Sequence, residues 1–147
     1  MQNAYPCVLT PEEGGGFSVS FPDVPEALTC GNDLTDALAM AEEALTVALA
    51  IYLQLDEDPP APSPLREGQH PVTLPAMAAA KLAIYSAMRL QGMTHAALAA
   101  HLDTSERAVR QLLDLDHGSH TSEVEKALRV VGRDSMIEES ATHFPKV

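Results

Sequence analysis

The sequence predicts an α+β fold in which an antiparallel sheet and one helix are followed by an all-helical part. Apolar and polar residues alternate in short runs up to Gly31, and apolar residues recur every three or four positions from Leu34 onward. A proline-rich segment, 56–71 (DEDPPAPSPLREGQHP), separates two regions of different pattern. The expected organisation is a domain at 1–55, a linker at 56–75, a helical domain at 76–132 and a tail at 133–147.

The N-terminal region predicts three antiparallel strands. Residues 4–10 and 17–21 each alternate with a period of two. The glycine-rich stretch 11–16 between them supplies the positive φ angles that a hairpin requires. A short run at 27–31 completes a β-meander, and a further short strand is expected at 71–75, after the proline-rich segment.

A helix is expected directly after the meander. Asn32 or Asp33 can serve as its N-cap. Apolar residues at helical spacing form one stripe, which should pack on the sheet. The predicted stripe consists of Leu34, Leu38, Ala41, Leu45, Ala48, Leu49 and Tyr52.

Four helices are predicted after the linker. Their expected spans are 76–91, 95–102, 106–113 and 122–131. Thr94 and Ser105 are suitable N-caps for the second and third of them. Gly92 and Gly132 are expected to end the first and the fourth.

The second and third of these helices form a predicted helix-turn-helix. Two short helices over 93–113 are joined by a turn of about three residues. Asp103 lies in the turn, where the backbone needs left-handed angles that aspartate tolerates. Here the sequence resembles the Xre/Cro-type helix-turn-helix family, with LDTSERAVRQLL standing at the turn and the recognition helix. The resemblance implies binding to operator double-stranded DNA.

The residues expected to contact DNA lie at helix starts and on the outward face of the third helix. Arg107 or Arg110 could donate a bidentate pair to guanine, and Gln111 could do the same for adenine. Each arginine taken alone is better explained as a solvated residue on an ordinary helix, but their joint placement at the reading positions of the motif favours DNA contact. Hydroxyls and amides at helix N-termini suit phosphate contacts. The predicted set is Thr94, His95, Ser105, Glu106, Arg107, Arg110 and Gln111.

The charges are divided unevenly along the chain. Its net charge of −12 lies almost wholly in residues 1–70, which hold twelve acidic residues and one basic residue, Arg66. Such a region repels nucleic acid and attracts cationic surfaces, although acids also serve simply as a solvated face. Residues 71–147 hold eight bases and nine acids, few bases for a DNA-binding monomer. A homodimer on two half-sites, or a tetramer, is therefore expected.

The first forty-five residues resemble the HicB antitoxin family. The resemblance lies in Tyr5-Pro6, Gly16-Phe17, the FPDVP at 21–25, the TCG at 29–31 and the DAL at 36–38. It implies a partial RNase H-like domain that neutralises a HicA-type toxin, a small basic mRNA-cleaving protein, through residues 1–55. It also implies repression of the protein's own operon by residues 76–132. The candidate toxin-binding residues are Glu12, Glu13, Phe17, Asp23 and Glu26.

No catalytic residue, metal ligand or cofactor is predicted. Nuclease chemistry of the RNase H type needs several carboxylates converging on metal ions. The N-terminal acids are instead spread over a hairpin, a turn and a helix. Two alternatives stay open: a stand-alone helix-turn-helix transcription regulator with a ligand-sensing N-terminal domain, and a metal-dependent nuclease.

The two cysteines and the N-terminal residues indicate the cellular compartment in which the protein is expected. Cys7 and Cys30 match no metal-ligand spacing, and we expect two thiols on neighbouring strands of the core rather than a disulfide. The first residues show neither the basic region nor the apolar run of a secretion signal. No segment is apolar enough to span a membrane. We therefore expect a cytoplasmic protein.

Overall fold

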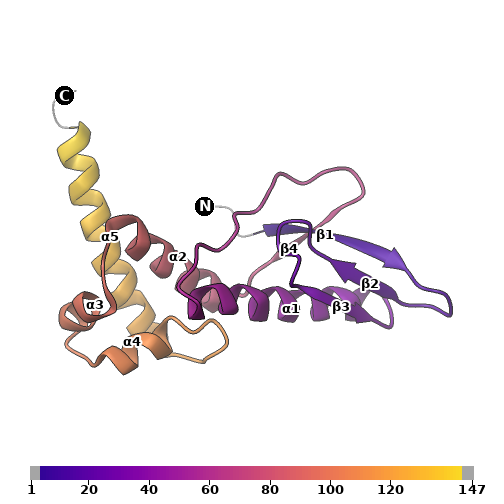
Figure 1. The fold of residues 1–147 in the computed structure, drawn as a ribbon, viewed down its shortest axis with the longest axis horizontal. Helices are drawn as coiled ribbons and strands as arrows, with labels where there is room; N and C mark the ends of the chain where they lie inside the picture. Colours follow the sequence, from indigo (N-terminus) through magenta and orange to yellow (C-terminus); the bar gives the residue numbers. More distant parts are fainter. Residues whose placement is uncertain (1–3, 144–147) are drawn as a thin grey trace. The chain divides into compact units, whose positions relative to one another are not determined.

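The computed structural model describes residues 4–143, with side chains described as far as residue 132 (Figure 1). Over this range the chain is a mixed α+β protein with a four-stranded antiparallel sheet and five helices. It divides into two compact units, with the boundary between Ala79 and Ala80. The segment 56–75, expected as a linker, therefore belongs to the first unit.

The sheet of the first unit has the strand order β3-β2-β1-β4. Strands β1 (Ala4–Pro11), β2 (Phe17–Ser20) and β3 (Leu28–Gly31) pair as consecutive antiparallel neighbours, which confirms the predicted meander. Strand β4 (His70–Thr73) pairs with the free edge of β1, close to where a further short strand was expected. The sheet is therefore extended beyond β1 by chain that returns after the proline-rich segment, and β4 is its edge strand.

Helix α1 (Leu34–Gln54) lies along one face of the sheet (Figure 1). Of the two candidate N-caps, Asp33 takes this role, because its carboxylate accepts a hydrogen bond from the Asp36 amide at 2.8 Å. The middle of the predicted stripe is buried, as Ala41, Leu45 and Leu49 show. Leu34 is 44% exposed, contrary to the prediction, because the first turn of α1 follows directly from the edge strand β3, where the sheet ends.

Gly31 marks the closest approach of the helix to the sheet. A Cβ atom at this position would lie 2.3 Å from the backbone nitrogen of Ala37 and 2.4 Å from its Cα. Real Cβ atoms do not approach backbone so closely, so only glycine lets β3 and α1 pack as they do.

The proline-rich segment is held against the first unit by hydrogen bonds. The hydroxyl of Tyr5 donates to the carbonyl of Pro60 at 2.7 Å. The amide and the hydroxyl of Ser63 donate to the two carboxylate oxygens of Asp23 at 2.8 and 2.6 Å. These bonds fix the path of the chain between α1 and β4.

Helices form the second unit, although the first four residues of α2 precede its boundary. Their bounds are α2 (Ala76–Gln91), α3 (His95–Leu102), α4 (Glu106–Leu112) and α5 (Thr121–His143). The spans of α2, α3 and α4 agree with the predicted ones to within a residue. Leu98, Val109 and Ala127 are fully buried in the core of this unit. The side-chain amide of Gln91 donates to the carbonyl of Val131 at 2.9 Å and so ties α2 to α5.

The prediction that Gly132 ends the last helix was wrong. Helix α5 continues through Gly132 to His143, so most of the predicted tail is helical, while residues 144–147 lie outside the described residues. A glycine inside a helix costs only about 1 kcal/mol relative to alanine. It ends a helix only where the chain turns away, and here the next residues include good helix formers.

The two cysteines do not both lie in the core, contrary to the expectation. Both thiols are free, but Cys7 is buried on β1 while Cys30 is exposed on β3, and β2 runs between them. Cys30 pairs with Ser18, whereas the neighbouring Thr29 pairs with the buried Val19. Because side chains alternate between the faces of a strand, Cys30 lies on the face opposite to Val19.

No helix within the part of the chain that the structure describes is both long and apolar enough to cross a membrane.

Candidate functional site

Helices α3 and α4 follow one another through a short turn, and each begins at a capping hydroxyl. The hydroxyl oxygen of Thr94 accepts a hydrogen bond from the Ala97 amide at 3.0 Å, and that of Ser105 accepts from the Ala108 amide at 3.1 Å, so both predicted N-caps are confirmed. Asp103 has φ 53° and ψ 52°, which confirms the left-handed turn position. These local features fix where each helix begins and how the chain passes between them.

Four of the predicted DNA-contacting residues lie together on the exposed side of α4. Arg107, Arg110 and Gln111 are three and four positions apart, so they share one face of the helix, and Glu106 is exposed beside them. Val109 and Leu112 point the other way and are buried. Because the buried face is packed, the helix presents its polar face in one orientation.

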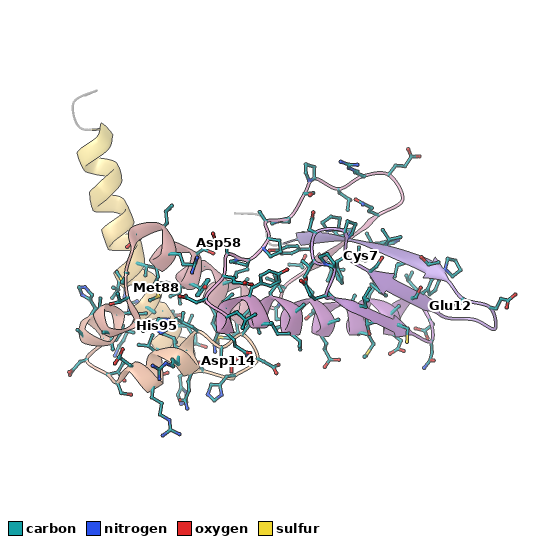
Figure 2. All side chains as sticks on the ribbon, in the orientation of Figure 1. Cys7, Glu12, Asp58, Met88, His95 and Asp114 are labelled. Carbon is teal, nitrogen blue, oxygen red and sulfur yellow. The ribbon has the colours of Figure 1, made fainter. Side chains whose placement is uncertain are left out.

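The remaining three predicted residues lie at the starts of the two helices. Thr94 and Ser105 are exposed, and a hydroxyl that accepts a cap hydrogen bond still has its own hydrogen to donate. His95 begins α3 (Figure 2), and its burial is intermediate. The sequence thus located a set of polar groups on one short segment.

Lys81 supports this segment and was missed as a polar anchor. Its side chain is fully buried, and its ammonium nitrogen donates to the carbonyls of Gln111 (3.3 Å) and Asp114 (2.9 Å). It also donates to the carbonyl of His117 and to the hydroxyl of Ser119. A lysine at a core position of a helix was the signal available.

These hydrogen bonds hold the end of α4 and the loop that follows it. Burial lowers the pKa of Lys81 below its ordinary value, while the negative charges of Asp114 and Glu123 act in the opposite direction. An ammonium inside the unit is tolerated because oxygen acceptors surround it. Lys81 therefore acts as a cationic cap on the carbonyl end of α4.

The candidate toxin-binding residues lie in three places on the first unit. Glu12 and Glu13 are exposed where the β1–β2 hairpin projects (Figure 2), and Phe17 is half-buried at the start of β2. Asp23 and Glu26 lie in the turn between β2 and β3. The structure does not gather the five into one cluster of hydrogen-bonded side chains.

Asp23 and Glu26 already have partners within the first unit. Asp23 holds Ser63, as described above. Glu26 accepts from the hydroxyl of Tyr52 at 2.8 and 2.9 Å, and this hydrogen bond raises the pKa of Tyr52 above its ordinary value. Sequence reasoning could not detect these roles, because each pair is separated by more than twenty-five residues.

No group of three or more His, Cys, Asp or Glu side chains within the described range is arranged to hold a metal ion.

Comparison with known proteins decides the family. The model of the HicB-like antitoxin of bacterial toxin–antitoxin systems matches residues 4–83 of the chain, more than half of its length. The chain belongs to the HicB-like antitoxin family. The matched residues comprise the sheet, α1, the proline-rich segment and the start of α2, so they coincide closely with the first unit.

Relatives of the HicB-like family also match beyond the first unit. Antitoxin HicB of Escherichia coli (strain K12) is 33% identical over 130 residues, which is 88% of this chain and 94% of that protein. Antitoxin HicB 1 of Photorhabdus laumondii is 37% identical over 128 residues, 87% of this chain and 81% of that protein. Antitoxin HicB of Pseudomonas fluorescens is 33% identical over 124 residues, 83% and 84% of the two chains. Matches of this length include part of the helical unit.

Proposed function

We propose that the protein neutralises a HicA-type toxin through its first unit and represses its own operon through its second. Membership of an antitoxin family implies a toxin partner. The observation that carries the division of labour is the charge distribution between the two units. The acidic first unit suits a cationic partner, whereas α4 presents two arginines and a glutamine on one exposed face.

The second unit is proposed to bind operator DNA as a helix-turn-helix. Helix α4 would enter the major groove, where Arg107 or Arg110 can pair with guanine and Gln111 with adenine. Thr94, His95 and Ser105 would contact phosphates at the helix starts. The packing of Val109 and Leu112 and the Lys81 hydrogen bonds favour this role, because direct recognition of bases needs a helix held in one orientation.

A homodimer is the proposed DNA-binding form. The region from residue 71 onward holds only eight bases against nine acids, so one copy offers few phosphate contacts. Two copies on two half-sites double these contacts and match the usual symmetry of such operators.

The first unit is proposed to cover the RNA-binding surface of the toxin. A surface that binds RNA is cationic, and the acids of the first unit would imitate the phosphate charges that it normally contacts. Its sheet and helix are a candidate partial RNase H-like fold. Among the predicted contact residues Glu12, Glu13 and Phe17 have the clearest freedom to face a partner, because Asp23 and Glu26 also hold the fold together.

A charge-matched pair of double variants tests the DNA side. Arg107→Ala with Arg110→Ala removes two positive charges from the exposed face of α4. Lys126→Ala with Arg129→Ala removes two from exposed positions on α5. Titration of operator DNA should show that the first variant binds with an affinity about 100-fold lower, since each base-contacting pair is worth about 1–3 kcal/mol. The second should change affinity far less. Equal losses would show that charge alone matters and would refute recognition by α4.

A further inference from the structure

The outward side of α1 carries an apolar stripe that the sheet does not cover. Met40, Val47 and Ile51 are 37%, 47% and 43% exposed. Together with the half-buried Ala44 they follow one another at spacings of four, three and four residues, so they lie along one side of the helix. We call these four residues the α1 ridge.

A group of neighbouring exposed apolar residues indicates an interaction surface, whereas scattered ones do not. Single exposed apolar side chains are common on soluble proteins and need no explanation. Three large ones at helical spacing form a continuous surface, which is how an interaction surface on a helix is recognised. The buried side of the same helix, with Ala41, Leu45 and Leu49, already packs on the sheet. The α1 ridge is therefore a second apolar face.

The charges around the α1 ridge determine which partner it fits. Helix α1 contains no lysine or arginine, and none occurs anywhere in residues 4–65. Glu43 is exposed and lies three positions after Met40 and four before Val47, so it borders the ridge. A second copy of this chain, docked through the same ridge, would place its own acidic side chains against Glu43. The same negative charge would repel nucleic acid. A partner with basic residues around an apolar patch would be attracted.

We propose that the α1 ridge is the docking surface for the toxin, a cationic protein whose apolar patch covers Val47 and its neighbours. This inference rests on the proposed function and specifies its contact surface. Binding energy at protein interfaces is concentrated in buried side chains at the centre, with charged residues at the rim. The α1 ridge offers such a centre and Glu43 such a rim, whereas Glu12 and Glu13 lie on a hairpin among exposed polar residues and glycines.

The test uses the full chain and a purified HicA-type toxin, with affinities measured by titration calorimetry. Val47→Asp places a charge in the ridge, and Ala39→Asp places the same charge at an exposed position of α1 outside it. Val47→Asp should weaken toxin binding at least about 30-fold, the effect expected at the centre of an interface. Ala39→Asp should leave it within a few-fold. Unchanged thermal unfolding and operator binding establish that both variants are folded.

A second pair tests the rim without altering the apolar surface. Glu43→Lys should weaken toxin binding by about 10-fold at low salt, and added salt should reduce the difference. Glu13→Lys, which makes the same change on the hairpin, should have a smaller effect. If Glu13→Lys weakened toxin binding more than Glu43→Lys, the toxin would contact the hairpin and the proposal would be overturned.

The possible failures are distinguishable. If the unaltered chain does not bind the toxin, the proposed function itself fails. If it binds and Val47→Asp binds equally well, only the assignment of the α1 ridge fails. If Val47→Asp lowers the molecular mass of the free chain in light scattering while toxin affinity is kept, the ridge is a contact between copies and the proposal is wrong.

Discussion

At the scale of single residues, Tyr5 shows how one side chain links distant parts of the first unit. It is 2% exposed and its hydroxyl donates to Pro60. Burial, with a smaller contribution from the charge of Asp23, raises its pKa from 10.0 to about 12. A raised pKa means that the folded state favours the neutral phenol. The neutral phenol therefore contributes to the stability of the folded state. This contribution is complete below pH 10, the ordinary pKa of tyrosine, and is lost as the pH rises through about 12.

Replacement of Tyr5 by phenylalanine tests this assignment. The ultraviolet absorbance of tyrosinate, followed during an alkaline titration, should lose a step near pH 12 in Tyr5→Phe. The free energy of unfolding at neutral pH should fall by about 1 kcal/mol, the value of one hydrogen bond. Tyr52→Phe serves as the control, because Tyr52 bonds to Glu26 at a more exposed position. Loss of the step near pH 12 in the control, with the step kept in Tyr5→Phe, would contradict the assignment.

Lys81 is the second residue whose role depends on its partners. Lys81→Met keeps much of the side-chain volume but leaves the carbonyls of Asp114 and His117 without the ammonium. We expect unfolding in denaturant to show a loss of about 2–4 kcal/mol, because buried polar groups would lose their partners. Lys126→Met, at an exposed site, should change stability by less than about 0.5 kcal/mol. Equal effects would show that the Lys81 hydrogen bonds contribute little.

At the scale of elements, local signals predicted most of the fold. Alternation located the meander, and the side chains at positions 33, 94 and 105 marked where helices begin. The length of α5 could not be predicted, because whether a chain continues through Gly132 depends on whether anything turns it away. The pairing of β4 with β1 and the hydrogen bonds of the proline-rich segment are long-range contacts. Neither follows from the local pattern that identifies a strand or a loop.

The approach of β3 to α1 gives a prediction at this scale. Gly31→Ala would place its Cβ against the backbone of Ala37, so the strand and the helix would have to separate. We expect a loss of about 3 kcal/mol in the free energy of unfolding, as for overpacked cores. Gly118→Ala, where an added Cβ meets no atom within 4 Å, is the matched control in thermal unfolding. A Gly31→Ala variant of unchanged stability would show that β3 and α1 can move apart without a loss in the free energy of unfolding.

At the scale of the whole molecule, the chain joins two units with different surfaces. The sequence revealed the two regions through their charge and pattern, and it located the polar face of α4. Four of the five residues that it predicted to contact the toxin are acidic, and two of these acids have hydrogen-bonded partners within the first unit. Asp23 and Glu26 serve the fold, while the α1 ridge is recognised only once the buried side of the helix is known.

The central claim is that the protein silences a toxin independently of α4, the helix proposed to bind DNA. The most direct measurement is cleavage of an mRNA by a purified HicA-type toxin while the full chain is added in increasing amounts. Cleavage should stop when chain and toxin are equimolar, and the variant with Arg107→Ala and Arg110→Ala should give the same curve. Continued cleavage in the presence of excess chain would contradict the account and favour a transcription regulator that acts without a toxin.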